Sequence, residues 1–208
     1  MLSLETIVTF FTASLLLGLA PGPDNIFVLT QSALRGRGPG LMVMLGLCTG
    51  LVVHTTAVAF GVAIIFQTSA IAFTALKFIG AGYLLYLAWH AFRAPAEKIQ
   101  SESTTGINYR RLYCRGIIMN ITNPKVSIFF LAFLPQFTDP QRGPMSIQIL
   151  LLGGLFIVAT ILVFGTIALL GGTLGQVLNR SDRAQKILNR VAGTVFLGIA
   201  LKLATTER

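Results

Sequence analysis

The chain has 208 residues, of which 54% are hydrophobic and only 11% are charged, whereas a soluble domain carries about 25% charged residues. Residues 38–76 and 143–179 contain no Asp, Glu, Lys or Arg. A membrane-spanning helix needs about 20 mostly apolar residues, so this composition excludes a soluble globular protein. The net charge of +9 does not indicate nucleic-acid binding, because most basic residues flank apolar segments.

Six apolar segments are predicted in chain order, at residues 4–34, 40–66, 69–92, 112–137, 146–173 and 186–204. The first segment is interrupted at Pro21–Asp24 and the fourth at Asn123–Pro124. A polar linker, residues 94–111, separates a first three-helix unit, residues 1–93, from a second, residues 112–208. The predicted fold is therefore an all-α polytopic membrane protein with about six transmembrane helices.

The basic residues predict the orientation of the chain in the membrane. The connections between segments 1 and 2, 3 and 4, and 5 and 6 hold 11 of them: Arg35, Arg37, Arg93, Lys98, Arg110, Arg111, Arg115, Arg180, Arg183, Lys186 and Arg190. The opposite side holds 3: Arg142, Lys202 and Arg208. Because cytoplasmic loops are enriched in Lys and Arg, we expect the linker in the cytoplasm and both termini outside. Segment 6 is the weakest prediction, since it is short and carries Lys202.

The two units resemble each other weakly in sequence. Aligning Pro23 with Pro124 places Asp24 on Lys125, and the two helix interruptions then coincide. Three segments per unit is an odd number, so the units must insert in opposite directions. Inverted repeats with paired broken helices are typical of secondary transporters, which bind substrate at the breaks.

The interruptions are the candidate binding site. Proline removes a backbone donor, and unpaired backbone groups are tolerated in a membrane only where protein or a water-filled cavity satisfies them. The freed N–H and C=O groups suit the carboxylate and ammonium of a zwitterion. The alternative is a pair of kinks used only for packing. The candidate substrate-binding residues are Pro21, Gly22, Pro23, Asp24, Asn25, Asn120, Asn123, Pro124 and Lys125.

Ionisable residues inside membrane segments are costly and usually functional or paired. Asp24 and Lys125 either flank the substrate or form a permanent ion pair between the two units. His54, near the middle of segment 2, has an unperturbed pKa of about 6.5 that suits a proton carrier, and a structural hydrogen bond is the alternative. Asp24 or His54 is the predicted proton-coupling residue. The small-residue pairs Gly46/Gly50 and Gly18/Gly22 are interpreted as helix-packing positions.

Other functional classes find less support in the sequence. A metalloenzyme or metal exporter needs clustered His, carboxylate or thiol ligands, and no HExxH motif is present among the two histidines, His54 and His90. We therefore expect no enzyme activity, no metal, no cofactor and no nucleic-acid partner. The open alternatives are an exporter of another small solute or cation, and a passive channel. The oligomeric state is left open, a homo-oligomer included.

Three motifs give the chain a family resemblance: "LAPGPDNIFVL" in segment 1, "KFIGAGYLLYLAWHAF" in segment 3 and "NITNPKVSIFFLAFLPQF" in segment 4. With them the chain resembles the LysE/RhtB family of bacterial amino-acid exporters over essentially its whole length, and its PGP motif is closer to the RhtB branch. The resemblance implies efflux of an amino acid of the threonine, homoserine or leucine type across the inner membrane, driven by the proton-motive force. Many relatives carry an acidic residue in segment 2 where this chain has Leu51, with His54 three residues later.

Overall fold

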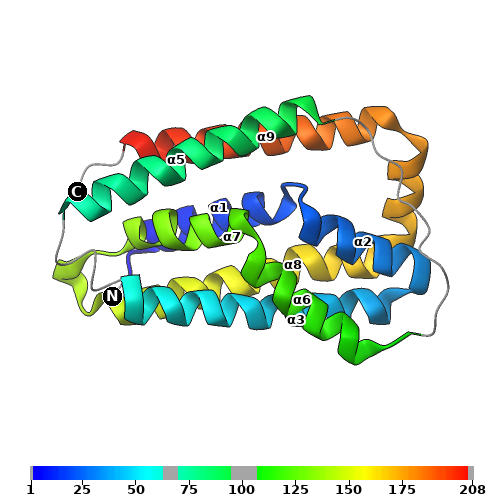
Figure 1. The fold of residues 1–208 in the computed structure, drawn as a ribbon, viewed down its shortest axis with the longest axis horizontal. Coiled ribbons are helices and arrows are strands. Elements are labelled where there is room, and N and C mark those ends of the chain that lie inside the picture. Colours follow the sequence, from blue (N-terminus) through cyan, green and yellow to red (C-terminus); the bar gives the residue numbers. More distant parts are fainter. Residues whose placement is uncertain (1, 63–69, 95–106, 206–208) are drawn as a thin grey trace.

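The computed structural model describes residues 2–62, 70–94 and 107–205, which form helices joined by short turns (Figure 1). The described part of the chain contains no strand, so the predicted all-α class is confirmed. The elements η1 and η2 are π-helical turns, and η3 and η4 are 3₁₀ turns. In chain order the elements are α1 (Leu4–Leu19), α2 (Pro23–Arg35), α3 (Arg37–Ala57), η1 (Val58–Val62), α5 (Ala70–Arg93), α6 (Tyr109–Thr122), α7 (Pro124–Ile128), η2 (Phe129–Phe133), η3 (Leu134–Phe137), η4 (Pro140–Arg142), α8 (Met145–Arg180) and α9 (Asp182–Thr205).

Both predicted helix breaks are present. The axes of α1 and α2 differ by 61°, and those of α6 and the half-helix that follows it differ by 50°. Ala20 and Asn123 both have extended backbones, because the residue before a proline is pushed out of the helical region. Pro23 and Pro124 each stand in the first turn of the next half-helix, where the missing N–H has no intrahelical partner to lose.

Equivalent helices of the two units run in opposite directions along the bundle (Figure 1). Helices of one unit also pack on helices of the other: α3 of the first unit lies on α6 of the second, and α8 of the second unit lies on α2 of the first. The third helices of the units, α5 and α9, pack against each other. These opposite directions agree with an inverted repeat of residues 1–93 and 112–208, which stays a prediction.

Both termini lie at the same end of the bundle (Figure 1). The opposite end holds the α2–α3 turn, the start of α6 and the α8–α9 junction. The α2–α3 turn consists of Gly36 alone, whose φ of 90° lies in the region that favours glycine. Termini at one end require an even number of crossings. Which end faces the cytoplasm stays a prediction.

The multi-pass membrane character of the chain is confirmed by its helices and its surface. Three helical stretches are individually long and apolar enough to cross a membrane: Arg37–Gly61, Met145–Gly175 and Asp182–Thr205. Counting each bent pair as one span raises the number to five within the described residues, and α5 is not among them. Six spans therefore stay a prediction. Large apolar side chains are exposed on many helices, among them Val8, Phe78, Leu162 and Leu201.

The connection between the fifth and sixth segments differs from the prediction. The sequence predicts apolar segments that end at residue 173 and begin again at residue 186, but α8 continues to Arg180 and α9 begins at Asp182. Only Ser181 lies between them, and its hydroxyl accepts a hydrogen bond from Ala184 N–H at 3.1 Å. A helix continues through polar residues as long as their helix propensity permits, so the end of an apolar run does not mark the end of a helix.

The crossing of α3 and α6 depends on glycine. A Cβ added to Gly116 would lie 2.5 Å from the Val43 carbonyl oxygen, and one added to Gly46 would meet the backbone of α6. A Cβ added to Gly50 would lie 2.6 Å from Asn120 Oδ1. The predicted packing role of Gly46 and Gly50 is therefore confirmed, because small residues let the two backbones approach closely.

Candidate functional site

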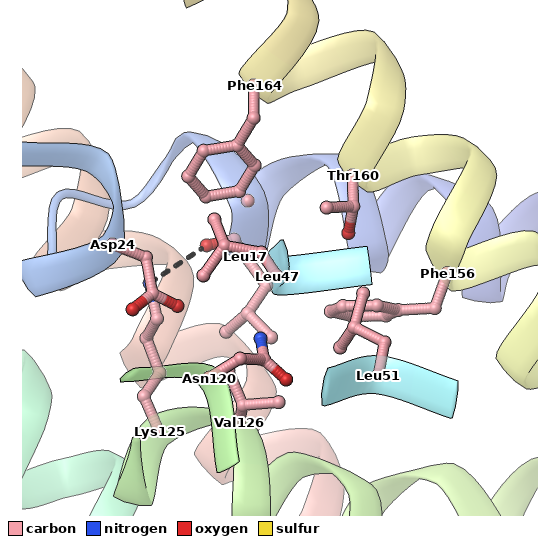
Figure 2. A pocket seen from close by; sticks show the side chains of 11 residues that line it. Leu17, Asp24, Leu47, Leu51, Asn120, Lys125, Val126, Phe156, Thr160 and Phe164 are labelled. Carbon is pink, nitrogen blue, oxygen red and sulfur yellow. Dashed lines mark hydrogen bonds between the residues drawn. The ribbon is translucent and has the colours of Figure 1, made fainter. Parts of the chain in front are cut away.

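The two helix breaks meet inside the bundle. Lys125, in the first turn of α7, is buried and donates from Nζ to the Ala20 carbonyl oxygen at 3.1 Å. The Leu17 carbonyl oxygen lies 3.5 Å from the same nitrogen, and the dashed line in Figure 2 marks this contact. These carbonyls have no intrahelical partner beyond the end of α1 and form the negative end of its dipole. An ammonium group of the second unit thus caps a helix of the first.

Asp24 occupies the matching position in the other break. It lies in the first turn of α2, where the positive end of the helix dipole stabilises a carboxylate. Asp24 Oδ2 accepts a hydrogen bond of 2.9 Å from Asn123 Nδ2, and Asn123 Oδ1 accepts from Lys125 N–H at 3.0 Å. Asp24 Oδ1 is buried and has no hydrogen-bond partner.

Asp24 and Lys125 lie in the described part of the chain and do not form an ion pair with each other. Of the two alternatives left open by the sequence, the permanent ion pair is therefore absent from this structure. Each charged group is instead held by uncharged groups of the opposite break, the Asn123 amide for Asp24 and backbone carbonyls for Lys125. The two opposite charges therefore attract each other electrostatically without being in direct contact.

Gly22 has a different role from the predicted one. A Cβ added there would lie 3.1 Å from Lys125 Nζ, so this glycine leaves room for the ammonium group and does not serve helix packing. Its backbone is extended, with φ of −164°, so conformational freedom is not the reason for glycine here. Gly18 has an ordinary contact of 3.4 Å to Val163.

Pro21, Pro23 and Pro124 shape the backbone of the two breaks. The other predicted residues contribute polar side chains. Asn25 donates from Nδ2 to the Gly18 carbonyl oxygen at 2.7 Å and so bridges the first break, while its Oδ1 is buried without a partner. His54 is half-buried and contacts the backbone oxygen of Asn120 through Nε2 at 3.2 Å.

A small cavity lies between the breaks and the helices α3 and α8 (Figure 2). Its volume is about 20 Å³, which is room for a water molecule but not for an amino acid. Of the predicted site residues, Asp24, Asn120 and Lys125 line it, and Asn120 Oδ1 has no hydrogen-bond partner. The other lining residues are Leu17, Gly18, Leu47, Leu51, Val126, Phe156, Thr160 and Phe164.

Sequence analysis missed the α8 wall of this cavity, Phe156, Thr160 and Phe164. The apolar run of α8 gives no sign of which face is inward, because a helix that is apolar all round has no distinct stripe. Thr160 is one of several hydroxyl residues in this apolar segment, with Thr166 and Thr173, so its presence alone does not identify the inward face.

Six phenylalanine rings, here called the aromatic cluster, lie between the cavity and the end of the bundle that holds both chain termini. Phe156 lines the cavity, and its ring centroid lies 5.1 Å from those of both Phe129 and Phe130. The series continues from Phe129 to Phe133 at 4.8 Å and from Phe133 to Phe137 at 4.9 Å. Phe10 of α1 completes the cluster, at 5.9 Å from Phe129 and 5.2 Å from Phe137.

A polar hollow of about 380 Å³ lies beyond the aromatic cluster, lined by Phe133 and Phe137 and by charged residues of both signs. The charged residues are Glu5, Asp139, Arg142 and Lys202. Lys202, the residue that made segment 6 doubtful, lies with Nζ 4.8 Å from the centroid of the Phe137 ring. Lys202 therefore lines this polar hollow, near the end of α9.

Residues 15–207 match the family model described as LysE type translocator. The chain belongs to this family. The match extends over both helix breaks and the cavity between them. The LysE family consists of transporters, so its members act by moving a solute and not by chemical conversion.

Individual relatives cover nearly the whole of this LysE-type chain. A homoserine/homoserine lactone efflux protein of Salmonella typhi is 34% identical over 199 residues, 95% of each chain. An uncharacterized membrane protein of Vibrio cholerae is 30% identical over 201 residues, 96% of this chain and 97% of the relative. A leucine efflux protein of Salmonella choleraesuis is 26% identical over 200 residues, 96% and 94% of the two chains. No solved structure matches the chain.

These relatives and the apolar helices make this LysE-type protein a multi-pass protein of the bacterial inner membrane. The described residues contain no group of three or more His, Cys, Asp or Glu side chains that would hold a metal ion.

Proposed function

We propose that this LysE-type translocator exports a zwitterionic amino acid of the threonine, homoserine or leucine type from the cytoplasm in exchange for protons. The observation that carries the proposal is the pair of opposite charges, Asp24 and Lys125, which line one cavity between two broken helices. The printed functions of two relatives, efflux of homoserine or its lactone and efflux of leucine, support this substrate class.

The charges suit the two ends of an amino acid. An ammonium group finds acceptors at Asp24 Oδ1 and Asn120 Oδ1, which are buried and have no partner. A carboxylate finds the Lys125 ammonium, which at present donates to carbonyl oxygens of α1. Hydrogen bonds to charged groups are stronger than those between neutral ones, so a carboxylate competes well with these carbonyls for Lys125.

The cavity of this conformation is too small for the substrate, so the two units must separate for binding and release. The contacts that change are those across the breaks, from Asn123 to Asp24 and from Lys125 to Ala20. An entering zwitterion replaces these contacts with its own charges, which lets the units part without leaving a charge unpaired in the membrane.

Proton exchange follows from the same site. Protonation of Asp24 from the outside removes the negative charge that holds the substrate ammonium, and the amino acid leaves. Deprotonation toward the cytoplasm restores the site for the next substrate. Asp24 is better placed for this role than His54, because Asp24 lines the cavity, whereas His54 is not among the lining residues and contacts the Asn120 backbone and the Phe130 ring.

The test uses the full-length protein in liposomes loaded with radiolabelled threonine, homoserine or leucine. An imposed pH gradient, with the outside of the liposomes acidic, should accelerate efflux at least several-fold over liposomes without a gradient. An ionophore that collapses the gradient should remove this acceleration. Equal efflux with and without the gradient indicates a passive channel, and no efflux of any amino acid rejects the proposed function.

A further inference from the structure

Gln31 is a buried polar side chain that the site at the two breaks does not use. It lies in α2 and is 1% exposed, and its Oε1 has no hydrogen-bond partner. The other buried side-chain atoms without a partner, among the described residues, are oxygens of Asp24, Asn25 and Asn120. Those three residues already belong to the candidate site, so the unpaired amide of Gln31 needs an explanation of its own.

A second buried glutamine in the described part of the chain shows what a structural role looks like. Gln148 of α8 is 3% exposed, and its Oε1 accepts a hydrogen bond from Asp139 N–H at 3.0 Å. Its Nε2 donates to the carbonyl oxygens of Asp139 and Gly143 at 2.8 and 3.0 Å. An unpaired buried acceptor is unfavourable, so Gln31, unlike Gln148, does not stabilise the conformation seen here.

The position of Gln31 relates it to the central cavity. Gln31 follows Asp24 by seven residues in α2, which is close to two helical turns, so both lie on one face of the helix, about 10.5 Å apart along its axis. From the first break, α2 runs to the end of the bundle opposite the termini (Figure 1). Gln31 therefore lies between the cavity and this end, which is the cytoplasmic end in the proposed orientation.

The helices are closed around Gln31 in this conformation. A Cβ added to Gly40 of α3 or to Gly171 of α8 would meet the side chain of Ser32, the next residue of α2. The buried apolar side chains one turn before Gln31 in α2 pack with residues of α3, α6 and α8. A polar solute that moves along this face of α2 therefore has to part these helices.

We propose that Gln31 binds the amino acid as it enters from the cytoplasm, in a conformation in which α2 has parted from α3 and α8 at this end. The inference rests on the proposed function and adds a second contact residue to the transport route. A glutamine amide both donates and accepts hydrogen bonds, so Gln31 pairs with either charged end of a zwitterion.

The unpaired amide also affects the balance between the two conformations. It disfavours the closed conformation, whereas water or substrate pairs with it in the open one. A substitution that removes the amide therefore favours the closed conformation and removes a substrate contact. Both effects lower the apparent affinity, because a ligand binds less well when the conformation that accepts it is less populated.

The first experiment compares the same substitution at the two buried glutamines. Gln31→Met should raise the KM for amino acid on the cytoplasmic face at least about fivefold, with an equal or higher melting temperature in detergent. Gln148→Met should lower the melting temperature, because it breaks three hydrogen bonds. Gln31→Asn keeps a shorter amide and should recover part of the affinity.

The second experiment measures access to the position directly. Gln31→Cys is made in a protein in which Cys48 and Cys114 are replaced by alanine, and a membrane-impermeant maleimide is added to inside-out vesicles. The new cysteine should react, and saturating threonine, homoserine or leucine should slow the reaction. Ile149→Cys is the control, because Ile149 is buried in α8 near the terminal end of the bundle and should not react from the cytoplasmic side.

The outcomes separate this inference from the proposed function. An unchanged KM in Gln31→Met, or a reaction of Gln31→Cys that none of the three amino acids slows, overturns the contact while the exporter stands. A melting temperature that falls as far in Gln31→Met as in Gln148→Met makes Gln31 a structural residue and overturns it as well. A wild-type protein that exports no amino acid rejects both proposals.

Discussion

The side-chain amide of Asn123 donates a hydrogen bond of 2.9 Å to the Asp24 carboxylate, although the two residues lie 99 positions apart in the chain. The same side chain accepts a hydrogen bond from Lys125 N–H at 3.0 Å and so caps α7. One amide therefore joins the first turn of α2 to the first turn of α7. The two broken helices cannot separate at this point without breaking the bond.

Removal of one charge from the site should be more harmful to folding than removal of both. Asp24→Asn or Lys125→Met leaves the other charge buried without an opposite charge, at about 2.5–3.5 kcal/mol on the insertion scale. We expect each single variant to lose export and to accumulate less in the membrane. The double variant should regain a near-normal amount of protein, measured by immunoblot of membranes, but not export. Normal export by the double variant would show that the pair is structural and that the substrate binds elsewhere.

Gly22→Ala tests whether the position of the Lys125 ammonium matters. The new Cβ would lie 3.1 Å from Nζ, so the end of the lysine side chain must shift by a few tenths of an ångström. We expect a normal amount of protein and export reduced at least several-fold, measured as efflux from loaded proteoliposomes. Gly154→Ala is the matched control, because no atom lies within 4 Å of its Cβ. If Gly22→Ala exports at the wild-type rate, export does not depend on the position of the Lys125 ammonium seen here.

Gly116→Ala should destabilise the fold itself. Its Cβ would lie 2.5 Å from the Val43 carbonyl oxygen, and backbone, unlike a lysine terminus, cannot move without shifting a helix. Overpacking of this kind typically costs about 1–3 kcal/mol. The melting temperature in detergent should fall clearly for Gly116→Ala and remain unchanged for Gly154→Ala. An unchanged melting temperature for Gly116→Ala would mean that α3 and α6 pack less closely than described.

Proton coupling should survive the loss of His54. His54→Gln removes the titrating group but keeps a donor for the Asn120 backbone oxygen, its contact at 3.2 Å. We expect this variant to export, and an uncoupler to collapse its export while ATP is maintained. Export by His54→Gln that no longer responds to the pH gradient would assign the proton to His54 in place of Asp24.

The sequence was sufficient for the helix breaks, because proline acts on the backbone next to it whatever the rest of the fold does. It was also sufficient for the matched positions of Asp24 and Lys125. It did not predict the bond between Asn123 and Asp24, since an asparagine before a proline is already explained by its capping role. Nor did it predict the α8 wall of the cavity, because the inward face of Phe156 and Thr160 is set by contacts between distant segments.

The charge distribution predicts the orientation, and the common end of the two termini makes it testable at two places. Reporter fusions in the 94–111 linker should give a cytoplasmic signal, and fusions at the C-terminus a signal from outside. Because α8 ends at Arg180 and α9 begins at Asp182, the basic start of α9 lies at the end of the bundle opposite the termini. Cytoplasmic signals at both places would contradict the six-span arrangement.

The aromatic cluster also bears on what happens when no substrate is bound. Its rings extend from Phe156 at the cavity to Phe137 at the polar hollow. Water and ions have no polar groups to follow through a stack of packed rings. In the proposed orientation, with the termini outside, the aromatic cluster lies on the side from which protons would enter. In the proposed exchange cycle, the packed rings would therefore prevent a proton leak through the protein when no substrate is bound.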